Sequence, residues 1–202
     1  MFSILIRTSG RPKFFDKCYK SVIAQTEDYK IIVSVDNKKS LEYVEKYPVH
    51  IVQVKQGRRE NKARCPWNRY FNDMMIRAEG WIIYLDDDVT MLPGALTKIK
   101  QFCTDMQNVI VWKYKFASGR VIPEKEYWQK APMRKHIDTG CFCHHKKQQV
   151  HWVTLRASDW RVIRQLWERK MNFIWIDEVL FEAGNNGTNG LKNDYESIVL
   201  PS

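Results

Sequence analysis

The sequence predicts an α/β domain with a mainly parallel central sheet that helices cover on both faces. Three observations support this fold class. Apolar, strand-like runs alternate with helical patterns through the first 112 residues, the order typical of parallel sheets. Two of the predicted strands end directly in aspartate. The chain has 202 residues, enough for one domain with a real core and too few for two ordinary ones.

The elements of the first half follow from local patterns. The apolar run at 3–6 stops at the turn Thr8–Pro12, after which apolar residues recur at the spacing of one helix face. Pro93 stands where it can open a later helix. We expect strands at 3–6, 31–35, 49–54, 81–85 and 109–112, and helices at 15–23, 41–47, 67–78 and 93–106.

The pattern is weaker after about residue 114. One helix is well marked, because Trp160, Ile163 and Leu166 share a face, and Ser158 is its expected N-cap. The remaining expectations are an excursion or short hairpin at 118–134, a strand and turn at 137–145, a short strand at 173–176 and a glycine- and asparagine-rich loop at 183–191.

The chain is basic, with 33 lysine and arginine residues against 23 aspartate and glutamate residues and a formal net charge of +10. A field of this sign favours polyanionic partners such as nucleic acid, an anionic membrane surface or phosphorylated ligands. A basic stretch at 55–64 either binds phosphate or is a solvated loop. Several of the eight tryptophans stand beside cations, which suits sugar rings or bases as well as a core.

The start of the chain does not resemble a leader, because Arg7 interrupts the apolar residues that precede it. No run approaches the roughly 18 apolar residues that a membrane-spanning helix needs. The five cysteines are odd in number and scattered, which favours a reducing compartment. We therefore expect a cytoplasmic protein.

The strongest chemical signal is the run of three aspartates at Asp86–Asp88, directly after a hydrophobic strand. In open α/β sheets ligands bind at the carboxyl ends of strands, so these residues and Asp36 should face one crevice. Adjacent carboxylates repel each other and are costly to bury without a cation. Mg²⁺ or Mn²⁺ would relieve that cost, because these ions prefer oxygen ligands. A metal site is favoured over a solvated acidic turn.

In this order the motifs resemble those of glycosyltransferase family 2, enzymes of the GT-A fold. The turn Thr8-Ser9-Gly10-Arg11-Pro12 is similar to the opening of the family, and 68–88 is similar to its asparagine-containing helix, strand and Asp-x-Asp sequence. Asp159-Trp160 and the following helix resemble its catalytic stretch. The resemblance spans about 4–177. It implies a single GT-A domain over 1–202, with a nucleotide-sugar-binding half at 1–112 and an acceptor-side half at 113–202.

The resemblance also implies a reaction: an inverting, metal-dependent transfer of one sugar from a nucleotide-sugar, with a UDP-sugar as first choice, to an acceptor hydroxyl. Asp88 and Asp86 would hold Mn²⁺ or Mg²⁺. Asp159 would be the general base, although its place at a helix start also suits a residue that only favours the helix dipole. In that case the base would be sought at Asp138, Asp177 or Glu178. The implied donor-binding residues are Thr8, Arg11, Asp36, Asp86 and Asp87.

Two segments refine this interpretation. Residues 165–169 read QLWER instead of the Gln-x-x-Arg-Trp of processive sugar polymerases, which favours a single transfer. Cys141–His145 holds two cysteines and two histidines, but their spacing does not match a structural zinc site. A strand near the acceptor side is the better interpretation of this segment, with one histidine within reach of metal or substrate.

The acceptor stays open at this point. It could be a hydroxylated base in modified, phage-type DNA, or a glycan, lipid-linked or protein acceptor at the envelope. A nucleotidyltransferase that uses Mg²⁺ at the strand-end aspartates is the enzymatic alternative. A basic nucleic-acid-binding module without activity is the third possibility, but the sequence has no helix-turn-helix, finger or RNP-type signature.

Overall fold

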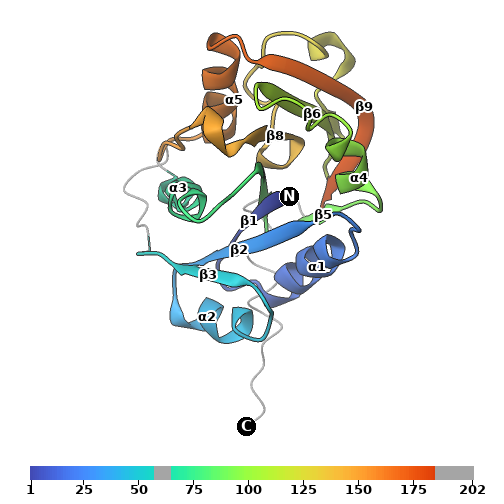
Figure 1. The fold of residues 1–202 in the computed structure, drawn as a ribbon. Coiled ribbons are helices and arrows are strands. Elements are labelled where there is room, and N and C mark those ends of the chain that lie inside the picture. Colours follow the sequence, from blue (N-terminus) through green and yellow to red (C-terminus); the bar gives the residue numbers. More distant parts are fainter. Residues whose placement is uncertain (57–64, 185–202) are drawn as a thin grey trace.

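The computed structural model describes residues 1–56 and 65–184. Within these residues one nine-stranded mixed sheet runs in the order β3-β2-β1-β4-β8-β6-β9-β5, with β7 paired to β6. Helices α1 and α2 lie on one side of the parallel strands, and α3 and α5 lie on the other (Figure 1). The predicted fold class is confirmed. No helix in this part of the chain is long and apolar enough to cross a membrane.

The first half forms the parallel part of the sheet, in which β3, β2, β1 and β4 are neighbours. Its predicted strands are confirmed. Helix α1 begins three residues earlier than predicted, α2 lies three residues earlier than predicted, and α3 is shorter than predicted. The helix expected at 67–78 begins as a 3₁₀ turn at Pro66–Arg69. The bounds are β1 Phe2–Thr8, α1 Pro12–Ile23, β2 Tyr29–Val35, α2 Lys38–Val44, β3 His50–Gln53, α3 Tyr70–Met75 and β4 Trp81–Asp86.

The helix expected at 93–106 extends only over Ala95–Lys100. Gly94 precedes it in the left-handed conformation, with a φ of 73°, so Pro93 does not open it. At the other end the side chain of Asn108 donates to the carbonyl of Phe102 at 2.9 Å, which turns the chain toward β6. The remaining bounds are β5 Val89–Met91, α4 Ala95–Lys100, β6 Asn108–Lys115, β7 Val121–Ile122, β8 Phe142–His145, α5 Ser158–Glu168 and β9 Asn172–Ala183.

The last strand is the largest departure from the sequence expectation. A short strand at 173–176 is predicted, whereas β9 has 12 residues and pairs with both β6 and β5. The pairing with β6 shifts register after Trp112, so that Asp177 and Glu178 fall in a bulge. These two charges break the apolar pattern in the sequence, but a bulge lets them point to solvent without ending the strand.

Ser158 does not cap α5. The residue before the helix is Ala157, in the left-handed conformation with a φ of 55° and no side-chain cap. The hydroxyl of Ser158 is buried and accepts a hydrogen bond from the amide of Val153 at 3.1 Å. The predicted N-cap is therefore wrong, because the hydroxyl supports the preceding loop instead of the first helical turn.

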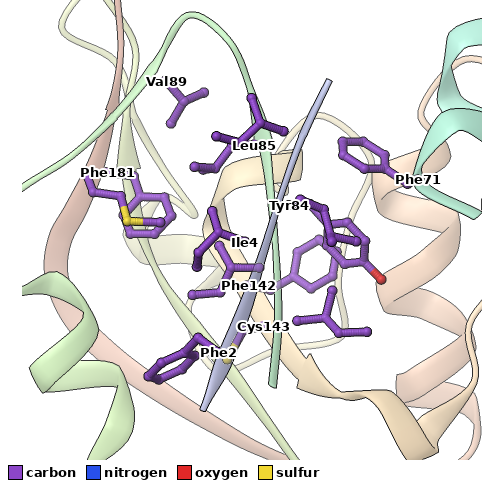
Figure 2. Packing of buried hydrophobic residues seen from close by; sticks show 14 of the residues in the cluster. Phe2, Ile4, Phe71, Tyr84, Leu85, Val89, Phe142, Cys143 and Phe181 are labelled. Carbon is purple, nitrogen blue, oxygen red and sulfur yellow. The ribbon is translucent and has the colours of Figure 1, made fainter. Parts of the chain in front are cut away.

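The segment Cys141–His145 belongs to the core. Strand β8 lies antiparallel between β4 and β6, and the buried His144 shares a 2.7 Å hydrogen bond with the hydroxyl of Tyr84. Burial lowers the pKa of His144 to about 4, so its imidazole is neutral. Figure 2 shows residues of this core, among them Phe71, Tyr84 and Phe142. His145 lies opposite Trp81, at the start of β4. The expectation that a histidine reaches metal or substrate is therefore wrong.

Gly80 fixes the start of β4 against the start of β1. The amide of Trp81 donates to the carbonyl of Met1 at 3.3 Å, and an added Cβ at Gly80 would lie 2.4 Å from that same oxygen. This close approach sets the register in which Phe2 faces Trp81 and, five residues later, Arg7 faces Asp86.

We expect Gly80→Ala to destabilise the fold more than Gly94→Ala. Both glycines have a positive φ, of 63° and 73°, which costs an alanine about 1 kcal/mol in either place. Only Gly80 adds a backbone clash, since nothing lies within 4 Å of a Cβ at Gly94. Overpacking should cost about 1–3 kcal/mol more. Urea unfolding of both variants measures the difference, and equal losses would contradict the register argument.

Candidate active site

The site begins at the edge of the sheet where β1, β2 and β4 end. Strands β1 and β4 are parallel, and Arg7 lies directly opposite Asp86. Because side chains alternate along a strand, Arg7 and Asp86 project from one face and the next residues, Thr8 and Asp87, from the other. The consecutive aspartates therefore enter different environments.

On one face Arg7 and Asp86 form a two-point ion pair. The Nε atom of Arg7 contacts one carboxylate oxygen of Asp86, and an NH2 group donates to the other at 3.0 Å. The remaining NH1 group donates to Asn68 at 2.7 Å, and the guanidinium lies 4.9 Å from the ring centroid of Phe71. The side chains of Arg7 and Asp86 are only 15% and 26% exposed. Burial alone would raise the pKa of Asp86, but Arg7 outweighs it and lowers that pKa.

Arg7 and Asn68 are functional candidates that the sequence analysis did not identify. The available signal was a cation inside an otherwise apolar strand, Phe2–Thr8, where a charge needs a partner. Local pattern alone does not say which carboxylate pairs with it, because the partner lies 79 residues away in the sequence.

On the opposite face the side chains of Thr8 and Asp87 are buried. Asp87 is 0% exposed, and its carboxylate accepts from the hydroxyl of Thr8 at 2.6 Å and from Arg11. The hydroxyl of Thr8 also contacts that of Tyr43 at 2.6 Å. Burial raises the pKa of Asp87 to about 7, although Arg11 and Thr8 oppose the rise. Thr8 and Asp87 therefore hold Arg11 in place.

Asp88 is the least firmly paired of the three aspartates. One of its oxygens accepts from Arg11 at 3.3 Å, and its side chain is 11% exposed. Burial and the nearby charge of Asp86 raise its pKa, so an added cation would stabilise the ionised form. Its backbone carbonyl is anchored by the amide of Gly184 at 2.5 Å.

No group of three or more histidine, cysteine, aspartate or glutamate side chains is arranged to hold a metal within 1–56 and 65–184. The carboxylate of Asp88 nevertheless offers oxygen ligands, which suit a divalent ion whose other ligands come from the substrate and from water. Mg²⁺ usually binds through one or two carboxylates together with substrate phosphates and water. Asp88 and its surroundings therefore suit a metal ion that binds together with a diphosphate better than an ion that the protein binds alone.

Asp36 directly follows β2, and three hydrogen-bond donors hold its carboxylate in place. It accepts from Ser9 at 3.0 Å, from Asn37 at 2.6 Å and from the hydroxyl of Tyr70 at 3.1 Å. Asn37 in turn caps α2, accepting from the amide of Ser40 at 2.8 Å. The carboxylate is thus positioned at the same sheet edge as Arg7 and Asp86.

A second pair of carboxylates faces this edge from the later part of the chain. Asp159 lies in the first turn of α5 and Asp138 precedes the 3₁₀ turn Thr139–Cys141, and both line one hollow of about 350 Å³. Burial raises the pKa of Asp159 to about 6. Burial and then the charge of Asp159 raise the pKa of Asp138 to about 8. Both carboxyl groups therefore hold their protons more tightly than an ordinary aspartate does, and ionisation of one hinders ionisation of the other.

Arg7 connects the two sides of the site. Burial would lower its pKa, but the charges of Asp86, Asp138 and Asp159 together raise it. Asp177 and Glu178, the other residues considered as a base, pair with Lys113 and Lys98 on the exposed bulge of β9. Most of the basic stretch 55–64 lies outside the described residues.

We expect Arg7→Gln to destabilise the fold by about 3 kcal/mol, because removing one member of a buried ion pair leaves the other charge unpaired. The double variant Arg7→Gln/Asp86→Asn should lose less than the sum of the two single variants. Lys98→Gln, which breaks a surface pair with Glu178, is the matched control and should change stability little. Urea unfolding measures all four, and additive losses would argue against coupling.

The comparisons with known proteins agree with this fold. The chain spans three fifths of the TarS 1–349 structure from S. aureus, with 90% of its own length covered, a TM-score of 0.72 and 16% identity. It is also similar to the mannosyltransferase PcManGT from Pyrobaculum calidifontis in complex with GDP-Man and Mn²⁺, with a TM-score of 0.63, 10% identity and coverage of 96% and 60% of the two chains. No curated protein matches the sequence.

The fold alone does not separate the two enzymatic interpretations. A CMP:2-keto-3-deoxy-manno-octonic acid synthetase bound to CTP is similar as well, with a TM-score of 0.58, 12% identity and coverage of 95% of both chains. The sequence decides between them, because the model of "Glycosyl transferase family 2" matches residues 3–162, from β1 into α5. The chain therefore belongs to glycosyl transferase family 2.

Proposed function

We propose that this chain is a glycosyltransferase that moves one sugar from a nucleotide-sugar to an acceptor hydroxyl with inversion at the anomeric carbon. The observation that carries the proposal is the arrangement around Arg7, which pairs with Asp86 at the end of β4 and also feels the charges of Asp138 and Asp159. Family membership supports the reaction class. TarS was solved with UDP-GlcNAc, which supports a UDP-sugar as the first donor to test.

On the donor side we assign the roles by contact and burial. Asp36, held by three donors, would receive the base or ribose, and Arg11 would direct positive charge to the diphosphate while Thr8 and Asp87 hold it from below. Asp88 would be the protein ligand of Mn²⁺ or Mg²⁺. Asp86 was also expected as a ligand, but both of its oxygens accept from Arg7, so its proposed part is to place negative charge near the site.

The divalent ion, when bound, offsets the negative charge that develops on the departing diphosphate. Asp159 would accept the proton of the acceptor hydroxyl. The acceptor oxygen then bonds to the anomeric carbon as the bond to the diphosphate breaks on the opposite face. Burial and the charge of Asp159 raise the pKa of Asp138, so the pair resists carrying two negative charges, and we assign the ionised member to Asp159. Residues 1–112 would thus serve the donor and 113–202 the acceptor.

The metal assignment predicts that UDP binds at least about tenfold more tightly with Mn²⁺ than with a chelator. Asp88→Ala should remove this enhancement, because Asp88 is less firmly paired than its neighbours Asp86 and Asp87. Asp105→Ala, on an exposed turn, is the matched control and should keep it. Calorimetry with UDP measures the effect. Equal affinities of the unmodified protein with metal and with chelator would exclude the metal.

The base assignment predicts that Asp159→Asn slows transfer by about 10²–10⁴-fold, the usual contribution of a general base. Release of UDP from a UDP-sugar, with water as acceptor, provides the assay. UDP affinity should hold within about twofold, since the donor contacts lie elsewhere. Asp177→Asn is the control on the surface of β9. A stable Asp159→Asn variant with normal turnover would show that Asp159 is not the base and only interacts favourably with the dipole of α5.

The same residue predicts a pH profile. A base works only when ionised, and burial raises the pKa of Asp159 to about 6. Turnover should therefore fall about tenfold per pH unit as the pH drops below about 6. An ordinary aspartate would keep turnover constant down to about pH 4. A profile that stays flat between pH 7 and pH 5 would contradict the assignment.

A further inference from the structure

The hollow beside Asp138 and Asp159 has a second wall that the reaction as proposed does not use. Its volume of about 350 Å³ corresponds to roughly ten water molecules at about 30 Å³ each, which is room for a sugar- or polyol-sized group. The two carboxylates line one part of it. The rest is lined by three cations and four apolar residues, namely Arg120, Arg134, Lys135, Phe116, Ile122, Ile137 and Ala157.

Two of the three cations have no carboxylate partner. Arg120 pairs with Glu124 at 2.6 Å and donates to the backbone carbonyl of Lys135 at 3.0 Å, so it supports the loop. Arg134 and Lys135 are exposed and form no ion pair with any other described residue. Their charges are therefore available to a ligand in the hollow.

Arg134 and Lys135 are not the cations with the strongest effect on Asp138 and Asp159. The cation that most strongly opposes the rise in pKa of both aspartates is Arg7, which reaches them from β1. Arg134 and Lys135 lie on the loop before Asp138 and line the same hollow as the two aspartates. The proposed base and these two cations thus border one space.

The backbone of this wall is strained at two places. Lys135 has a φ of 74° and Ala157 a φ of 55°, in the left-handed region that non-glycine residues seldom adopt. Such conformations persist where surrounding contacts enforce them, and they are concentrated at ligand sites. The carbonyl of Lys135, held by Arg120, is one such contact.

We propose that this hollow is the acceptor subsite and that it selects an acceptor with a phosphate group close to the hydroxyl that receives the sugar. The inference rests on the proposed function. Arg134 and Lys135 bind the phosphate through charge-assisted hydrogen bonds, and Asp159 binds the hydroxyl. The hydroxyl proton passes to Asp159, the acceptor oxygen bonds to the anomeric carbon, and the electron pair of the broken bond leaves with the nucleoside diphosphate.

The test uses the simplest matched pair of probes, glycerol 3-phosphate and glycerol, with UDP and Mn²⁺ present. Calorimetry should detect glycerol 3-phosphate and no glycerol. Arg134→Gln and Lys135→Gln should each weaken that binding about tenfold, as loss of a charge-assisted contact does. Lys130→Gln, an exposed cation outside the hollow, is the control and should leave it unchanged. UDP affinity in each variant reports whether the donor side is folded.

The diester glycerophosphoglycerol distinguishes the source of the phosphate. Binding of the monoester alone identifies a free phosphorylated compound, and binding of both identifies a phosphodiester chain. Equal binding of glycerol and glycerol 3-phosphate, or binding that both substitutions leave intact, overturns the proposal. Failure of the proposed function would be seen separately, as loss of UDP binding and UDP-sugar hydrolysis in the unmodified protein.

Discussion

The site depends on one interaction, the buried ion pair between Arg7 and Asp86. Charges lose hydration when they are buried, so such a pair persists only with good geometry and satisfied hydrogen bonds. The in-register pairing of β1 and β4 supplies the geometry, and Asn68 takes the remaining donor. The positive charge also acts on Asp138 and Asp159. Without Arg7, the carboxylates of Asp86, Asp138 and Asp159 would lose the one cation whose charge acts strongly on all three.

The alternation of side chains along β1 and β4 gives the three consecutive aspartates different tasks. Asp86 faces the side of the sheet that carries α3 and α5, where it pairs with Arg7. Asp87 faces the side of α2 and is buried under Thr8 and Arg11. Asp88, just past the strand, is the one with spare coordinating capacity. An acidic run in a sequence is therefore not a set of equivalent ligands, since period-two geometry separates its members.

Local patterns were sufficient for the fold class, the parallel strands of the first half and the acidic end of β4. They were insufficient wherever a long-range contact decides the outcome. The length of β9 depends on a bulge that only the pairing with β6 reveals. The hydroxyl of Ser158 accepts a hydrogen bond from the amide of Val153 and does not cap the helix. The imidazole of His144 shares a hydrogen bond with the hydroxyl of Tyr84. Arg7 stands out in the sequence as a charge within a mostly apolar strand. Its partner Asp86 lies 79 residues away, and neither composition nor periodicity predicts the register of β1 and β4 that brings the two together.

Burial that raises the pKa of Asp159 also makes it a stronger base, because a carboxylate that binds its proton more tightly takes one from a hydroxyl more readily. The same burial would oppose the negatively charged acceptor proposed above, since two aspartates line the hollow. The raised pKa of Asp138 reduces the negative charge that this residue carries, and Arg7 offsets part of the rest. In the proposed subsite Arg134 and Lys135, which line the same hollow, supply the attraction for an anion.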